Sequence, residues 1–347
     1  MPDRMVALTE GIADPIDAKF ATAVLRYRLA DVVGVVDSTH AGRTCQEVYG
    51  IGGSMTIAAS LDDVAAGADT LLLGGAPPGG LIPADWRAII LHAVRRGMKV
   101  VSGNHEFLTD DPDFVAAARQ SGAELVDLRK NDCRRIATGR GFRPECLRIH
   151  TVANSCACGK MTVTLELDAG LRRRGVDSHF VATGQIGIAI AANGLPIDRV
   201  IGDFISGAAE ELVLTHQNHD VLLIEGQGSL LDCRYSAVTL GLLHGSRPDG
   251  LIYCYQIGRP AFGFGGPGEP PEPPIAEVIR YYETTASLIH PCRVFAVAVN
   301  GRAVSADRVN RECEAIEAQL GLPACDVVLH GPGKLVEATL AFRNNHM

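Results

Sequence analysis

The segment Thr151-Val-Ala-Asn-Ser-Cys-Ala-Cys-Gly-Lys-Met-Thr162 follows a strand predicted at residues 146–152 and opens a helix predicted at residues 160–173. A loop of small residues that ends in Gly-Lys-x-Thr between a strand and a helix is typical of phosphate binding. The backbone N–H groups and the helix dipole favour an anion there, and the lysine can reach terminal phosphates. The segment therefore predicts a phosphate-binding loop (P-loop).

The motif departs from the standard G-x-x-x-x-G-K-[ST] pattern in two places. Asn154 stands where the first glycine is expected, and Met161 stands where the hydroxyl residue is expected. A hydroxyl follows one position late, at Thr162. An ordinary helix start is the alternative, but we expect phosphate binding by the whole loop: Asn154, Ser155, Cys156, Ala157, Cys158, Gly159, Lys160, Met161 and Thr162.

The composition excludes several classes of protein. The chain has 347 residues, of which 47% are hydrophobic, so two domains with sizeable cores are expected. The net charge of -8 and the lack of a basic, aromatic-rich patch argue against nucleic acid as a partner. Apolar runs are too short for a membrane span, and the start of the chain lacks a signal core. We therefore expect a cytoplasmic protein without a membrane partner.

The ten cysteines form no C-x-x-C pair, so we expect most of them to be small buried apolar residues rather than metal ligands. Cys156 has two interpretations. A helix N-terminus lowers the pKa of a thiol and would make it reactive. The alternative is a small side chain that fits a tight turn.

The first half of the chain alternates short apolar strands with helices, which indicates a parallel, Rossmann-like sheet. The first turn lacks G-x-G-x-x-G, so NAD binding is not expected. Asp37 follows the second strand, and we expect a solvated acid there. The predicted elements are strands at 5–9, 32–36, 70–73 and 99–102 and helices at 17–29 and 86–96.

A basic, glycine-rich stretch at 139–145 predicts a linker between a domain at 1–138 and a domain at 146–347. Nearly continuous apolar runs in the second half predict strands that are covered on both faces. The fold class is therefore α/β, with two doubly wound parallel sheets. Strands of the second domain are expected at 146–152, 178–182, 221–225, 250–254 and 294–299, with one more near Val327.

A proline- and glycine-rich segment at 258–275 interrupts this alternation. Such a composition excludes a helix or a central strand. The segment follows the carboxyl end of a predicted strand, where ligands of α/β proteins bind. We expect a lid over the site; a flexible insertion is the alternative.

Polar residues follow other predicted strands of the second domain. Glu225 ends an apolar run before Gly226 and Gln227, and its carboxylate is expected to hold Mg²⁺ or to cap a turn. Asp203 is a second acid that either binds the metal or caps a helix. Thr183 and Gln185 follow another strand and are expected at the same edge. In the first domain, His105 is either a base or substrate ligand or a structural histidine.

Ordered motifs along nearly the whole chain resemble a bacterial and archaeal family long catalogued as of unknown function. In the first half they are Gly74-Gly-Ala-Pro-Pro-Gly-Gly80 and Ser102-Gly-Asn-His-Glu-Phe-Leu108. In the second half they are Cys158-Gly-Lys-Met-Thr162, Ala182-Thr-Gly-Gln185, Asp203-Phe-Ile-Ser-Gly207, Glu225-Gly-Gln-Gly-Ser229 and Leu240-Gly-Leu-Leu-His-Gly245. The family includes D-glutamate N-acetyltransferase. The resemblance implies a Rossmann-like N-terminal domain, a P-loop C-terminal domain and, through the family, a homo-oligomer.

The second domain is also similar, more distantly, to dethiobiotin synthetase. That resemblance implies that Lys160 contacts the γ-phosphate of ATP and that Glu225 binds Mg²⁺. The chain departs from both relatives at Ala153 and Ser155, where glycine and aspartate are usual, and at Met161. These changes argue against ordinary ATP hydrolysis.

Three functions fit these features. The first is transfer of an acetyl or other acyl group from acetyl-CoA to the amine of D-glutamate or a similar amino acid, with Lys160 in the anion site and His105 or His244 as the base. The second is an amide ligase that uses ATP with Mg²⁺, held by Glu225, Asp203 and Thr162. The third is a nucleotide sensor without chemistry.

Overall fold

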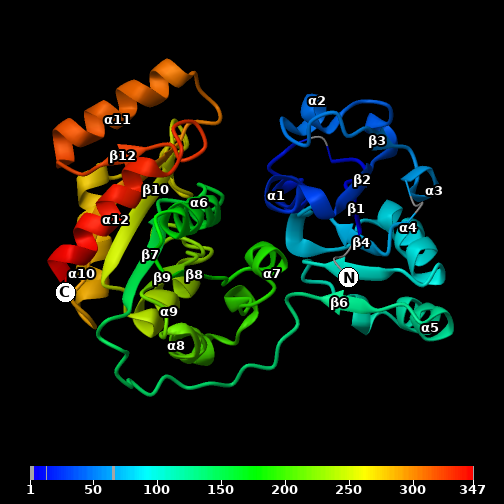
Figure 1. Cartoon of the computed structure of the whole chain (residues 1–347), viewed down its shortest axis with the longest axis horizontal. Helices are drawn as coiled ribbons and strands as arrows, with labels where there is room; N and C mark the ends of the chain where they lie inside the picture. The colour runs from blue at the N-terminus through cyan, green and yellow to red at the C-terminus, as the bar shows by residue number, and fades with distance from the viewer. Residues whose placement is uncertain (1–3, 13, 65–66, 347) are drawn as a thin grey trace. The chain divides into compact units, whose positions relative to one another are not determined.

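The computed structural model describes residues 4–12, 14–64 and 67–346. Backbone contacts divide the chain into two compact units (Figure 1). The first unit is Met1–Lys130 with Ile188–Ala192, and the second is Asn131–Gly187 with Asn193–Met347. The predicted linker at 139–145 lies in the second unit, in the irregular stretch that precedes its first strand.

The first unit is built on a six-stranded sheet in which every pairing is parallel. Its order, β3-β2-β1-β4-β5-β6, is the strand order of the Rossmann fold. The four longer strands lie where the sequence predicts them, whereas β3 and β6 were not predicted. The strands are β1 (Met5–Leu8), β2 (Val32–Val36), β3 (Ile57–Ala58), β4 (Thr70–Leu73), β5 (Lys99–Ser102) and β6 (Leu125–Asp127).

The helices of this unit pack on the sheet through buried apolar side chains such as Trp86, Ile90 and Phe114. They are α1 (Lys19–Tyr27), α2 (Cys45–Tyr49), α3 (Leu61–Val64), α4 (Ala84–Arg95) and α5 (Pro112–Ser121). Short 3₁₀ turns lie at η1 (Leu29–Asp31), η2 (Ser38–His40), η3 (Pro78–Gly80) and η4 (Leu108–Asp110).

The side chain of Asp37 was expected to be solvated, but it is completely buried. Its carboxylate accepts hydrogen bonds from the backbone N–H and the hydroxyl of Thr39, at 3.0 and 2.6 Å, and from the backbone N–H of Gly11 at 3.3 Å. His40 Nδ1 lies 2.9 Å from the same carboxylate. Asp37 therefore closes the turn after β2.

The second unit also contains six parallel strands, in the order β12-β11-β10-β7-β9-β8. The P-loop strand β7 lies in the interior of the sheet, between β9 and β10. Every residue of β7 is buried, as expected for a strand covered on both faces. The strands are β7 (Leu147–Ala153), β8 (Ser178–Val181), β9 (Val221–Ile224), β10 (Gly250–Gln256), β11 (Arg293–Asn300) and β12 (Ala324–Cys325).

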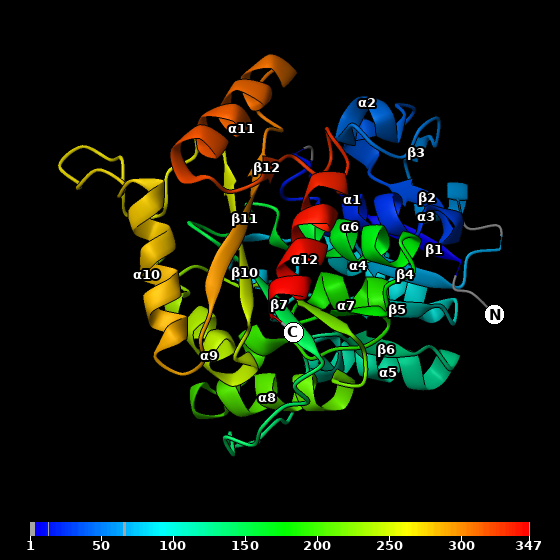
Figure 2. The same cartoon turned by 60° about the vertical axis from the view of Figure 1, so that its left-hand side comes forward.

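Helices cover both faces of this sheet (Figure 2). Side chains of α6 and α12 pack on one face, and side chains of α9, α10 and α11 pack on the other. The helices are α6 (Lys160–Arg173), α8 (Ile205–His216), α9 (Ser236–Ser246), α10 (Ile275–Ser287), α11 (Ala306–Leu320) and α12 (Gly333–His346), with 3₁₀ turns at η5 (Ile197–Arg199) and η6 (Gly202–Phe204). Helix α7 (Gln185–Ala191) begins in this unit, and its residues from Ile188 onward belong to the first unit.

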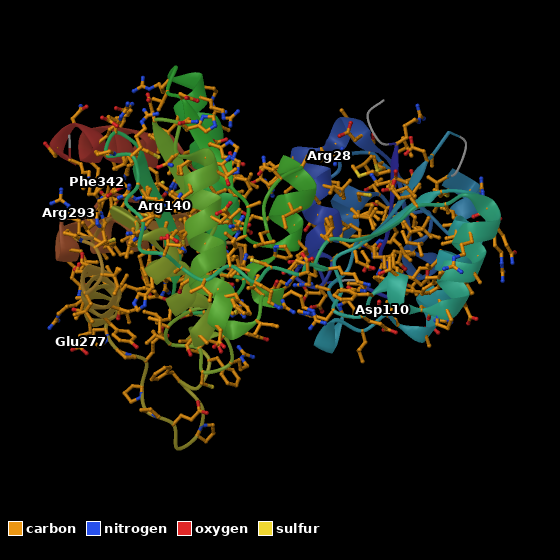
Figure 3. All side chains as sticks on the ribbon, turned by 90° about the horizontal axis from the view of Figure 1, so that it is seen from below. Arg28, Asp110, Arg140, Glu277, Arg293 and Phe342 are labelled. Carbon is orange, nitrogen blue, oxygen red and sulfur yellow. The ribbon has the colours of Figure 1, made fainter. Side chains whose placement is uncertain are left out.

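Phe342 attaches the C-terminal helix α12 to β11. Its ring stacks on Phe295 with 4.5 Å between the centroids, and the guanidinium of Arg293 lies 5.0 Å from its centroid (Figure 3). Burial of two aromatic rings with a cation over one of them stabilises this contact.

The α/β class with two doubly wound parallel sheets is therefore confirmed. Among the residues that the structure describes, no helix combines the length and the apolar character that a membrane span requires.

Candidate functional site

The P-loop connects β7 to α6 through residues 154–159. Two of these residues have left-handed backbones, Ala157 with φ of 55° and Gly159 with φ of 105°. A left-handed conformation is uncommon for alanine and costs about 1 kcal/mol or more, and such strain concentrates at functional sites. Left-handed residues in a turn direct successive backbone N–H groups into one concavity, which is the geometry that binds anions.

Lys160 ties the P-loop to the segment after β9. Its ammonium donates hydrogen bonds to the carbonyl of Ser155 at 3.0 Å and to the carbonyl of Gly228 at 2.8 Å. These contacts use two of its three N–H donors. The side chain is only 6% exposed, so the charge lies in a desolvated site where its attraction for an anion is strong.

Asn154, the residue that replaces the first glycine, binds the proline- and glycine-rich segment. Its Nδ2 donates to Oε1 of Glu272 at 2.7 Å and lies 3.4 Å from the carbonyl of Arg259. Oε2 of Glu272 accepts from the backbone N–H of Ala261 at 3.0 Å. One carboxylate thus closes the base of the segment and attaches it to the P-loop. We call residues 258–274 the lid loop.

A second contact joins the lid loop to the segment after β9. The guanidinium of Arg234 lies 3.6 Å from the ring centroid of Phe262. Asp232 accepts from this guanidinium, with Nη2 at 2.8 Å. The thiol of Cys156 donates to the same carboxylate, with sulfur and oxygen 3.7 Å apart.

The environment of Cys156 argues against a reactive thiol. Burial raises the pKa of Cys156, and this effect exceeds the opposing effect of the nearby Lys160. A thiol that stays protonated is a poor nucleophile. The structure therefore favours the second interpretation, a small side chain in a tight turn.

Two supporting residues carry no signal in the sequence. The hydroxyl of Tyr282, on α10, donates to the carbonyl of Ala153 at 2.7 Å and accepts from the backbone N–H of Leu230 at 2.9 Å. Asn300, at the end of β11, donates to the carbonyl of Cys158 at 3.3 Å. Both side chains hold the P-loop backbone in place.

Glu225 lies directly after β9 and is 3% exposed. Its Oε2 accepts from the backbone N–H groups of Thr183 at 2.9 Å and Gly184 at 3.1 Å, and the hydroxyl of Thr183 donates to the carbonyl of Glu225 at 2.6 Å. Burial raises the pKa of Glu225 to about 7, although the two N–H groups oppose this shift. A carboxyl of this pKa changes its charge near neutral pH.

The two residues after Glu225 complete this edge of the sheet. A Cβ atom on Gly226 would lie 1.7 Å from the carbonyl oxygen of Thr151, so only glycine fits. The side-chain amide of Gln227 donates to the hydroxyl of Thr183 at 3.2 Å. Gln185 is buried at the first turn of α7. The structure thus brings Thr183, Glu225 and Gln227 together at one edge of the sheet. The binding roles expected of Thr183, Gln185 and Gln227 stay predictions.

The residues expected to hold a metal are not gathered in this way. Thr162 is half-buried in the first turn of α6, next to Met161. Asp203 is exposed in η6. Within the described part of the chain, no hydrogen bond or ion pair joins Asp203 to Glu225.

The two candidate bases lie in different units. His244 lies near the end of α9, three residues before Arg247, whose carbonyl accepts from Arg148 Nε at 2.9 Å. Arg148 is at the amino-terminal end of β7, whereas the P-loop follows its carboxyl end. His244 therefore lies toward the amino-terminal ends of the strands, away from the P-loop, because α9 runs back across the sheet. Its role as a base stays a prediction. His105 belongs to the first unit and follows β5.

These features define a two-unit α/β protein with a Rossmann-like unit and a P-loop unit. Residues 38–131 match the model of a domain of unknown function, DUF1611_N, described as a Rossmann-like domain. Residues 135–336 match the model of DUF1611_C, described as a P-loop domain. The chain belongs to the DUF1611 family.

Two named proteins are similar to about four fifths of the chain. The chain is 37% identical over 271 residues to a D-glutamate N-acetyltransferase of Pseudoalteromonas sp, covering 78% of this chain and 81% of that protein. It is 37% identical over 282 residues to a D-glutamate N-acetyltransferase of Tritonibacter scottomollicae, covering 80% and 83%. A crystal structure of a DUF1611 family protein from Anabaena variabilis has 34% identity and a TM-score of 0.89, with 98% of this chain and 100% of that chain covered.

The attachment of the lid loop through Glu272 can be tested by substitution. Glu272→Ala removes the acceptor of both Asn154 and Ala261. Each hydrogen bond contributes about 1 kcal/mol, so the loss of both should make amide exchange of the loop glycines about 30-fold faster. Hydrogen–deuterium exchange read by mass spectrometry measures this.

Glu269→Ala is the matched control, because among the described residues that exposed carboxylate accepts a hydrogen bond only from Gly266, within the loop. It should leave exchange at the base of the loop, around Ala261, unchanged. Equal exchange in Glu272→Ala and in the natural protein would contradict the attachment.

The second prediction concerns the burial of Glu225. Its pKa in the folded chain is about 7, against an ordinary value of 4.5, so the folded state binds the extra proton between these values. The protonated carboxyl therefore stabilises the folded state fully below about pH 4.5. This contribution to the free energy of unfolding, about 3 kcal/mol, is lost as the pH rises through 7. Glu225→Gln should remove this slope from the free energy of unfolding, measured by urea denaturation at several pH values.

The exposed Glu269→Gln variant should keep the pH dependence of the natural protein. If Glu225→Gln left the slope between pH 4.5 and 7 unchanged, the carboxyl would not be buried in the way the structure describes.

Proposed function

We propose that the protein is an N-acyltransferase that transfers the acetyl group of acetyl-CoA to the amine of D-glutamate. The observation that carries this proposal is the 37% identity, over about four fifths of the chain, to two proteins named D-glutamate N-acetyltransferase. Three features of the P-loop and its surroundings support it. They are an anion site, a carboxyl suited to take up a proton, and a set of residues that does not suit Mg²⁺.

The P-loop provides the anion site for a phosphate group of CoA. The left-handed residues Ala157 and Gly159 shape the backbone, and Lys160 supplies a buried positive charge. The lid loop attached through Glu272 keeps water from the site, so these electrostatic interactions are stronger than in water. An acyl-CoA requires binding of its phosphates but no cleavage of them.

The chemical step needs a base for the amine. The neutral amine attacks the thioester carbonyl, the C–N bond forms, the C–S bond breaks, and CoA leaves as the thiol. One proton of the substrate ammonium must be removed first. Glu225 is the carboxyl we assign to this role, because a pKa of about 7 is suited to a general base at neutral pH.

The same site argues against ATP with Mg²⁺. Oε2 of Glu225 already accepts two backbone N–H groups, and a carboxyl that is half-protonated near pH 7 is a weak ligand for Mg²⁺. Met161 replaces the hydroxyl that holds the ion in a standard P-loop. The residues present do not fit a Mg²⁺ site, so no step of the proposed reaction uses one.

An assay with defined donors tests the proposal. The purified protein is incubated with D-glutamate or L-glutamate and with either acetyl-CoA or Mg-ATP, and the products are read by mass spectrometry. We expect N-acetyl-D-glutamate and free CoA from acetyl-CoA alone. ADP formation that depends on an amine would contradict the proposal and indicate a ligase.

Variants of Lys160 and Glu225 test the roles that we propose for these two residues. Lys160→Ala should lower kcat/KM at least about 100-fold, because it removes the only side-chain cation of the P-loop segment 154–162, and Glu225→Gln should lower kcat by about 100-fold. Lys334→Ala, a half-exposed lysine on α12 paired with Glu317, is the control and should keep normal activity. Unchanged turnover in Lys160→Ala would show that the P-loop takes no part in catalysis.

A further inference from the structure

Three histidines form a cluster in the second unit. They are His179 in β8, His216 at the end of α8 and His219 in the turn that leads to β9. One ring nitrogen from each lies within 4.8 Å of the others, and in the described ranges this is the one group of at least three potential metal-binding side chains so close together.

The cluster is separate from the P-loop. β8 is the edge strand of the second sheet, and the turn between α8 and β9 lies at the amino-terminal ends of the strands. The P-loop, Glu225 and the lid loop follow the carboxyl ends of β7, β9 and β10. The proposed acyl transfer therefore gives these histidines no role.

The imidazole rings are stacked on one another. The ring centroids of His179 and His216 are 4.2 Å apart, and those of His179 and His219 are 4.7 Å apart. Nε2 of His179 is buried and has no hydrogen-bond partner among the described residues. A buried polar atom without a partner is unusual and requires an explanation, such as an ion that binds there.

His219 is oriented by a carboxylate. Its Nδ1 lies 2.7 Å from Oδ1 of Asp177, the residue before β8. A histidine that donates Nδ1–H to a carboxylate presents Nε2 as a basic ligand atom, which is the usual support of a metal-binding histidine. Asp177 also supplies a negative charge that attracts a cation.

The charges around the cluster permit a cation. The positive charge of Arg172 acts on His179, but Arg172 pairs with Asp168, with Nε and Oδ2 2.9 Å apart. This ion pair offsets the repulsion between Arg172 and a bound cation.

We propose that His179, His216 and His219 bind one divalent transition-metal ion of the zinc class, with water as a fourth ligand. Three imidazoles suit Zn²⁺, Ni²⁺ or Cu²⁺ better than Mg²⁺ or Ca²⁺. Nitrogen ligands of a tetrahedral ion lie roughly 3.3 Å apart, so the rings must rotate out of their stack to bind it. The ion would link the edge strand β8 to the end of α8 and so stabilise this end of the sheet.

Metal titration of the full chain, prepared without an affinity tag and treated with a chelator, tests the proposal. Zn²⁺ binding is measured by calorimetry, and Co²⁺ is added as a spectroscopic probe. We expect one saturable site per chain and a higher Tm with Zn²⁺. His216→Ala should lower the affinity by at least about tenfold and abolish the rise in Tm, and Asp177→Asn should lower the affinity about tenfold.

His92→Ala is the matched control, since that exposed histidine belongs to the first unit and pairs with Asp62. It should bind Zn²⁺ as the natural protein does. Because His216→Ala keeps all ten cysteines, loss of binding in that variant separates the cluster from binding by cysteine. If His216→Ala fails to fold, His219→Ala, whose side chain is 34% exposed, replaces it. Absence of a saturable site, or equal binding by the cluster variants and His92→Ala, would overturn the proposal.

Discussion

The candidate site depends on the close approach of the end of β9 to the end of β7. Only glycine fits at position 226, because any Cβ there would collide with the carbonyl of Thr151. The hydroxyl of Thr151 accepts from the backbone N–H of Gly226 at 3.0 Å, so the approach is also a hydrogen-bonded contact. It brings Lys160 within reach of Gly228 and places Glu225 beside the loop after β8.

In this arrangement, residues that distinguish the loop from the standard P-loop pattern make structural contacts. Asn154, in place of a glycine, supplies the amide that holds Glu272 and with it the lid loop. Cys158 fills a buried position, and its thiol donates to Oδ1 of Asn154, with sulfur and oxygen 3.4 Å apart. The side chains of Asn154 and Cys158 therefore fix the P-loop and attach the lid loop to it.

Strand positions were largely predictable from the sequence, because continuous apolar runs such as Val221–Ile224 mark strands buried on both faces. Strand ends then located Thr183, Glu225 and Gln227 at one edge. β3 and β6, with two and three residues, are too short to produce such a run.

Long-range side-chain contacts could not be predicted. Asn154 lies 118 positions from Glu272, and Ala153 lies 129 positions from Tyr282, so no local pattern marks either contact. The position of His244 away from the P-loop could not be predicted, because a histidine in a family motif gives no information on which end of its helix faces the site. The burial of Asp37 was missed because one of its backbone partners, Gly11, lies 26 positions away in another segment.

The central claim is that this P-loop binds the phosphates of an acyl-CoA rather than Mg-ATP. Calorimetric titration of the natural protein and of Lys160→Ala with CoA and with Mg-ATP tests it most directly. We expect CoA to bind without a divalent ion, and we expect Lys160→Ala to lose this binding. Tight binding of ATP that requires Mg²⁺, with no binding of CoA, would contradict it.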